Sequence, residues 1–174
     1  MKVLILDDEN PKATKVKDVL VEKCGLDIEC IDIVPSISDA VGKMVSQIYD
    51  LLISDMRVPD YYGSQAIEDG GLKILQVIHN DNRILAPKNI VVITAHKELK
   101  EKYIAEVEKE SFDIVVYDDS SEEWKKKIVD KLTYLQRVEV SPRQKRSYMY
   151  DVAILTAVSR EQQAVKRLGT WMKV

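Results

Sequence analysis

Short apolar runs alternate with amphipathic stretches along most of this chain. Each run is rich in Val, Ile and Leu and lacks the polar alternation of a half-exposed strand, which is typical of strands covered on both faces. Five such strands are predicted, at residues 2–6, 28–34, 51–54, 90–94 and 114–117.

The stretches between these runs carry apolar residues at helical spacing. The first predicted helix opens with Asn10 as its cap before Pro11 and ends at Gly25. The second begins near Ser36 or Ser38. The other three show these apolar sets: Leu72, Leu75 and Ile78; Leu99, Tyr103 and Val107; Trp124, Ile128, Leu132 and Leu135. Strand followed by helix, five times over, predicts an α/β fold with a doubly wound parallel sheet.

After Leu135 the pattern changes. Residues 137–150 are polar and basic and contain a proline, which predicts a linker. A sixth apolar run, "DVAILTAV", and the start of a helix follow. We therefore expect a first domain at 1–136, a linker at 137–150, and at 151–174 the beginning of a truncated C-terminal domain. The basic linker is short and is interpreted as a solvated tether, so no direct contact with nucleic acid is expected.

Composition narrows the class of protein. The 174 residues are 45% hydrophobic and 32% charged, with a net charge of −3, which is typical of a soluble globular chain without bias toward nucleic acid or membrane. No apolar run approaches the roughly 20 residues that span a bilayer. The start of the chain does not match a signal peptide. A cytoplasmic location is expected, and Cys24 and Cys30 are interpreted as small core residues.

Carboxylates end two of the predicted strands. Asp7 and Asp8 follow the first strand, and Asp55 ends the third. If the strand order is 2-1-3-4-5, these acids meet outside the carboxyl edge of the sheet, where such folds bind ligands. Three close acids repel one another, and a hard cation such as Mg²⁺ relieves that repulsion. Thr94 would place a hydroxyl beside them, whereas Glu9 is expected only to cap the next helix.

The stretches "LILDDEN", "LLISDMRVPD" and "VVITAH" together resemble the receiver domain of two-component response regulators, over roughly residues 1–136. The resemblance implies a flavodoxin-like (βα)5 fold. It implies that Asp55 accepts a phosphoryl group from a sensor histidine kinase or phosphotransfer protein. Mg²⁺ would bind Asp8, Asp55 and the backbone carbonyl of Arg57, with Asp7 contributing through water. Thr94 would bind the phosphoryl group and shift on activation.

The resemblance breaks at the fifth strand, "FDIVVYDD". Receiver domains carry a lysine there, usually before a proline, and these two positions hold Tyr117 and Asp118. The aromatic switch position holds Ile114. Losing a cation beside the phosphoryl group should weaken its binding. Lys97 is either a substitute charge or a solvated lysine.

A second departure is an insertion at 60–69, before the helix opening "GGLKIL". Long loops beside a site are often functional. Tyr61, Tyr62 and Gln65 could therefore cover the acid pocket or bind a partner. The alternative is an ordinary surface insertion.

The tail "DVAILTAVSREQQAV" resembles the first strand and turn of the nucleoside phosphorylase and nucleosidase superfamily. Glu161 would match an acid that activates water there, while Ser159 and Arg160 replace neighbouring acids. No such activity is expected of this fragment itself.

Two functions remain open at this point. The first is a phosphorylated receiver that relays a signal to a fused C-terminal effector in a phosphorelay. It would be a regulatory domain that modifies only itself and turns over no substrate. The second is a phosphorylation-independent module that regulates a fused nucleoside phosphorylase-like enzyme. Homodimers through the fourth helix, fifth strand and fifth helix are expected.

Overall fold

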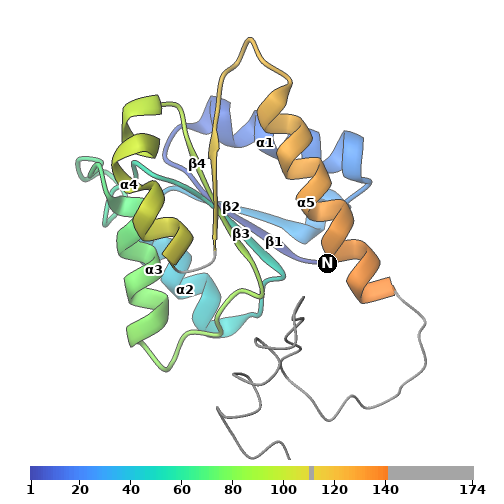
Figure 1. The fold of residues 1–174 in the computed structure, drawn as a ribbon. Coiled ribbons are helices and arrows are strands. Elements are labelled where there is room, and N and C mark those ends of the chain that lie inside the picture. Colours follow the sequence, from blue (N-terminus) through green and yellow to red (C-terminus); the bar gives the residue numbers. More distant parts are fainter. Residues whose placement is uncertain (110–111, 141–174) are drawn as a thin grey trace, which may run out of the picture. The chain divides into compact units, whose positions relative to one another are not determined.

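A computed structural model describes residues 1–109 and 112–140, which form a single five-stranded sheet with helices on both faces (Figure 1). The strands are β1 (Val3–Leu6), β2 (Ile31–Val34), β3 (Leu51–Asp55), β4 (Ile90–Thr94) and β5 (Asp113–Val116). Neighbouring strands are parallel, in the order β2-β1-β3-β4-β5. This confirms the predicted fold class and strand order.

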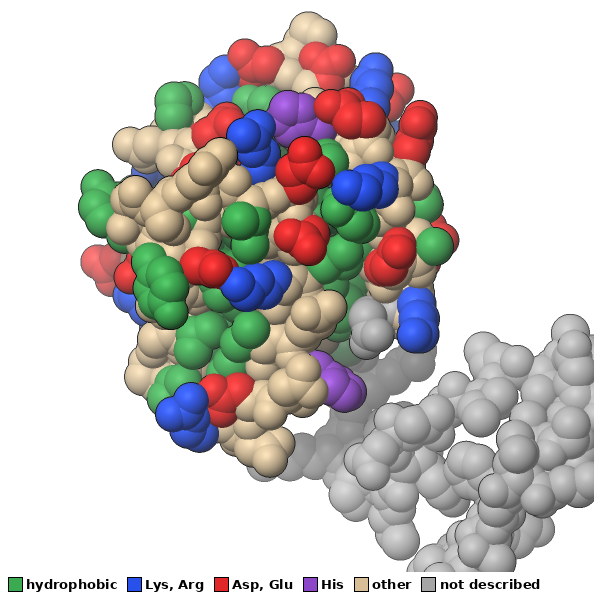
Figure 2. All heavy atoms as spheres, turned by 90° about the vertical axis from the view of Figure 1, so that its left-hand side faces the viewer, with side chains coloured by type: hydrophobic (Ala, Val, Ile, Leu, Met, Phe, Trp, Pro, Cys, Tyr) green, Lys and Arg blue, Asp and Glu red, His purple; other side chains and the backbone are tan. Residues whose placement is uncertain are grey.

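Five helices cover the sheet: α1 (Asn10–Cys24), α2 (Ile37–Ser46), α3 (Gly70–Asn80), α4 (Lys97–Lys109) and α5 (Glu123–Val140). Alternate strand residues such as Ile5 and Ile53 pack against α1 and α5. Their neighbours, such as Leu4 and Leu52, face α2 and α3. Because both faces are covered, the strands are continuous apolar runs. Acidic and basic side chains are mixed over the side where α3 and α4 lie (Figure 2).

Several local predictions needed correction. Asn10 is the first residue of α1 rather than its cap, and the side chain of Glu9 makes no capping hydrogen bond. Instead, the Glu9 backbone N–H donates to Asp7 Oδ1 at 2.8 Å. The strand predicted from residue 28 begins three residues later, because Ile28–Cys30 forms a 3₁₀ turn. Ser36 caps α2 by accepting a hydrogen bond from the Asp39 backbone at 3.2 Å.

The fifth helix is longer than the sequence suggested. Residues 137–140, expected to begin a linker, continue α5 as far as Val140. The rest of the expected linker and the terminal segment at 151–174, with Glu161, lie outside the described residues. Within residues 1–109 and 112–140, none of the helices has the length and apolarity to cross a membrane.

Candidate functional site

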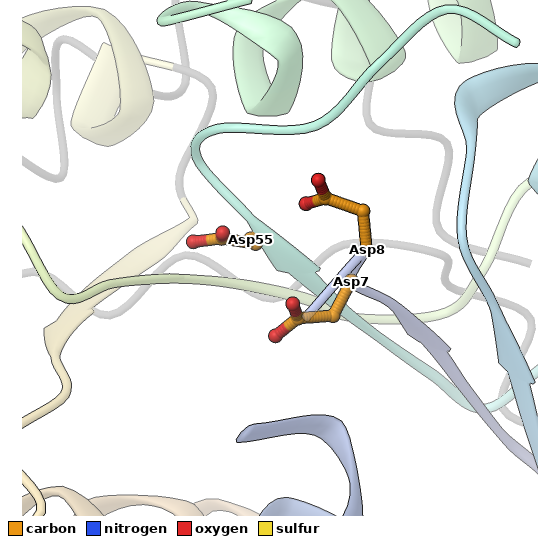
Figure 3. A group of neighbouring side chains, drawn as sticks. All are labelled: Asp7, Asp8 and Asp55. Carbon is orange, nitrogen blue, oxygen red and sulfur yellow. The ribbon is translucent and has the colours of Figure 1, made fainter. Parts of the chain in front are cut away.

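Three aspartates meet at the carboxyl edge of the sheet. Leu6 pairs with Ser54 in the β1–β3 register, so Asp7 and Asp55 follow at matching positions of adjacent strands. Carboxylate oxygens of Asp7, Asp8 and Asp55, one from each, lie within 4.8 Å of one another. Figure 3 shows the Asp7 and Asp8 side chains leaving the chain in opposite directions, with Asp55 beside them. Asp7 and Asp55 are buried, and Asp8 is exposed.

Each buried carboxylate uses one oxygen to accept a backbone hydrogen bond. Asp7 Oδ1 accepts from Glu9, and Asp55 Oδ1 accepts from Met56 at 2.8 Å. Asp55 Oδ2 lies 2.7 Å from the ammonium nitrogen of Lys12, and Asp7 Oδ2 lies 3.3 Å from the same atom. Asp7 Oδ2 nevertheless has no hydrogen-bond partner among the described residues. The site therefore holds a buried acceptor with unused capacity.

Lys12 was not anticipated by the sequence reasoning. Its side chain is only 4% exposed, although lysine is rarely buried without a charged partner. It precedes Val16 and Leu20 at spacings of four, on the face of α1 that packs against the sheet. Residues four apart lie on the same face of a helix, so the apolar pattern of Val16 and Leu20 could have placed Lys12 on the buried face of α1. The first turn of that face lies beside the acids at the strand ends.

Burial dominates the electrostatics of the cluster. It raises the pKa of the Asp7 carboxyl to about 7, against a lowering by Lys12 and with a further rise from Asp55. Burial also raises the pKa of Asp55, although Lys12 opposes this. For Lys12, burial would lower the pKa, but the charges of Asp55 and Asp7 outweigh it and the pKa rises. The Lys12 ammonium contacts two of the three carboxylates, and three carboxylate oxygens within 4.8 Å of one another are ligands that fit a hard cation such as Mg²⁺.

Two further predicted residues lie at this edge. Asp55 pairs with Ile93 in the β3–β4 register, so Thr94 is the next residue along β4. Thr94 is fully buried, and its Oγ1 accepts a hydrogen bond from the His96 backbone at 3.1 Å. Arg57 lies two residues beyond Asp55, with an exposed side chain. Its backbone carbonyl remains a predicted ligand.

The tyrosine at the lysine position packs against α5. The ring centroids of Tyr117 and Trp124 are 4.9 Å apart, and the Tyr117 hydroxyl donates to Asp119 at 3.1 Å. Ile114, at the aromatic switch position, is buried. Lys97, considered as a substitute cation, is exposed at the start of α4. The cation that contacts Asp55 is Lys12 instead.

The first residue of the insertion at 60–69, Asp60, contacts both α2 and α3. The Asp60 carbonyl accepts from the Ser38 backbone at 2.9 Å, and the Asp60 carboxylate pairs with Lys73 at 2.6 Å. Tyr61 and Tyr62 are 67% and 81% exposed, so neither is buried over the acids. A role for these tyrosines in binding a partner remains a prediction.

Gly71 allows α3 to approach the end of β3. A Cβ atom there would lie 2.9 Å from both the Asp55 carbonyl oxygen and Met56 Cα. We expect Gly71→Ala to lower the free energy of unfolding by about 1–3 kcal/mol, because backbone must move. Gly42→Ala is the matched control, since its Cβ meets nothing within 4 Å and alanine favours a helix. Urea unfolding measures both, and equal unfolding midpoints for Gly71→Ala and the wild type would contradict the expectation.

Comparison with known sequences gives one curated relative. No protein-family model matches the chain. The chain is 28% identical over 139 residues to the uncharacterized protein y4jS of Sinorhizobium fredii strain NGR234. The match covers 80% of this chain and 33% of y4jS, so the chain spans about a third of the length of this relative.

Solved structures identify the fold. The receiver domain of Francisella response regulator 1452 matches with a TM-score of 0.58 at 18% identity, covering 79% of this chain and 98% of that one. The response regulatory domain of mrkE from Klebsiella pneumoniae matches with a TM-score of 0.56 at 18% identity, covering 79% and 97%. CheY4 of Vibrio cholerae gives 0.55 at 18% identity, covering 75% and 97%. The chain thus has the flavodoxin-like fold of response regulator receiver domains.

Proposed function

We propose that this domain is a receiver that accepts a phosphoryl group on Asp55, with Mg²⁺ bound beside it. The observation that carries the proposal is the convergence of Asp7, Asp8 and Asp55 at the carboxyl edge of a receiver-type sheet. Asp7 Oδ2 adds to it, because this buried oxygen forms only the ion pair with Lys12 at 3.3 Å and no hydrogen bond among the described residues, which leaves it able to accept from a ligand.

The proposed reaction is nucleophilic attack by a carboxylate oxygen of Asp55 on phosphorus. The new oxygen–phosphorus bond forms as the bond from phosphorus to the donor imidazole nitrogen breaks, and the imidazole takes up a proton. Mg²⁺, held by Asp8, Asp55 and the Arg57 carbonyl with Asp7 nearby, would neutralise the charge on the transferring oxygens. Thr94 would turn its hydroxyl from His96 toward the phosphoryl group.

The test is incubation with Mg²⁺ and acetyl phosphate, followed by intact-mass and peptide mapping. We expect one phosphoryl group on Asp55 and none on Asp55→Asn. Asp18→Asn, which changes an exposed aspartate of α1, is the matched control and should be modified like the wild type. Folded wild-type protein that takes up no phosphoryl group, or takes it up on another residue, would contradict the proposal.

The proposed partners follow from the same role. A sensor histidine kinase or a phosphotransfer protein would supply the phosphoryl group in the cytoplasm, and an effector after residue 150 would receive the signal. Dimers through α4, β5 and α5 are also proposed.

A similar structure, at 16% identity and a TM-score of 0.52, is the beryllofluoride-activated NtrC4 receiver domain dimer. Beryllofluoride is therefore a suitable probe for this chain. A nucleosidase-like effector rests only on the resemblance of "DVAILTAVSREQQAV".

A further inference from the structure

We propose that Lys12 of α1 is the cation that binds the transferred phosphoryl group, in place of the strand-five lysine that this chain lacks. The inference rests on the proposed function and assigns it a further residue. Its basis is contact, since the Lys12 ammonium lies 2.7 Å from Oδ2 of Asp55, the oxygen that no backbone donor occupies.

The burial of Lys12 shows that the surrounding structure holds its side chain at the acids. The side chain is 4% exposed, while the neighbouring lysine of the same helix, Lys15, is 49% exposed and pairs with Asp119. Burying an ammonium costs more than a surface ion pair returns, unless close charges compensate it. Asp55 at 2.7 Å and Asp7 at 3.3 Å provide that compensation for the Lys12 ammonium.

Other cations lie elsewhere among the described residues. Lys97 is exposed at the start of α4, and the position of the family lysine holds Tyr117, which donates its hydroxyl to Asp119. Of the ion pairs that the described part of the chain forms, those of Asp7 and Asp55 both lead to Lys12. The charge missing at position 117, directly after β5, is therefore supplied by the first turn of α1.

Lys12 can act in the site both before and after phosphoryl transfer. Before transfer its ammonium neutralises the Asp55 carboxylate. After the bond from Asp55 to phosphorus has formed, the negative charge lies on the phosphoryl oxygens, one of which becomes the natural partner of the ammonium. An ammonium has three N–H donors, so the contact with Asp7 can persist. The same positive charge repels a metal ion bound by these carboxylates.

Lys12 is expected to attract the phosphoryl group and to repel the metal ion. Measuring both affinities therefore separates a role in binding from a role in supporting the fold. In Lys12→Met, we expect Mg²⁺ to bind more tightly, because a repelling charge is gone. At saturating Mg²⁺, we expect beryllofluoride to bind at least about tenfold more weakly, because a charge-assisted contact is lost. Calorimetric titration measures both affinities. Lys97→Met is the matched control and should leave both unchanged.

The outcomes distinguish the two proposals. Wild-type protein that binds no beryllofluoride would overturn the proposed function and this inference together. Normal wild-type binding with equal binding by Lys12→Met would overturn the inference alone, as would a loss in Lys97→Met instead. A fall in both affinities would indicate a merely structural Lys12. If Lys12→Met does not fold, a crystal structure of the wild-type beryllofluoride complex decides, since Lys12 must lie within hydrogen-bond distance of a fluorine atom.

Discussion

In Mg²⁺-free buffer above pH 7, Asp7→Asn is expected to raise the free energy of unfolding by about 2–4 kcal/mol. The reason is that burial raises the pKa of Asp7 from 3.8 to about 7, so its ionised form is disfavoured in the folded state. The side chain is 1% exposed, so solvent screens this cost little. Asparagine keeps the shape and can still accept the hydrogen bond from Glu9, but it carries no charge.

The pH dependence of this gain follows from the direction of the shift. A carboxyl whose pKa is higher when folded stabilises the folded state below its unfolded value and loses that contribution as pH rises through the folded value. The difference between wild type and Asp7→Asn should therefore open between pH 3.8 and about 7 and then stay constant. Urea unfolding across this range measures it, with Asp18→Asn as an exposed control. A constant difference at all pH values would contradict the assignment.

Trp124→Ala is expected to lower the free energy of unfolding by about 3–5 kcal/mol. Trp124 is 1% exposed and lies in the core shared by α1, α5 and the sheet, where its ring contacts Tyr117. Truncation leaves a cavity that these elements can close only in part. Because the substitution removes a fluorophore, circular dichroism during urea unfolding is the appropriate measurement.

Two further variants test this account of Trp124. Tyr134→Ala, on the same helix, should change stability by no more than about 0.5 kcal/mol, because Tyr134 is 63% exposed. Trp124→Phe should cost less than alanine, since it keeps most of the ring and removes an indole N–H that has no partner among the described residues. Equal losses in Trp124→Ala and Tyr134→Ala would refute a central role for Trp124.

The fold was predictable because each strand is covered on both faces. The run 90–94 is apolar except for its last residue, Thr94, and its predicted bounds are those of β4. Boundaries set by particular contacts were less predictable. Residues 28–30 are apolar enough to resemble strand but form a 3₁₀ turn before β2. Helix α5 continues to Val140, and the exposed Arg137 and Val138 show that the helix extends past the buried Leu135.

The acids of the site were predictable, but their counter-ion was not. Asp7, Asp8 and Asp55 follow apolar runs, so the strand order alone brings them together. A lysine in an amphipathic helix is normally assigned to the solvent face. The spacing of four from Val16 places Lys12 on the buried face of α1, but its contact with Asp55 depends on how α1 packs on the sheet, which a local pattern does not contain.

The position of Lys12 on α1, and not at the end of β5, has a consequence for how the sequences of related chains should vary. Burial raises the pKa of the Tyr117 hydroxyl and the Lys12 charge is one of the influences that oppose it, so lysine at both positions would bring two like charges to one site. Relatives are therefore expected to keep lysine at one position or the other, and the two positions should vary together. A family pattern that requires the strand-five lysine would pass over chains of this kind, whereas a pattern that accepts either position would recover them.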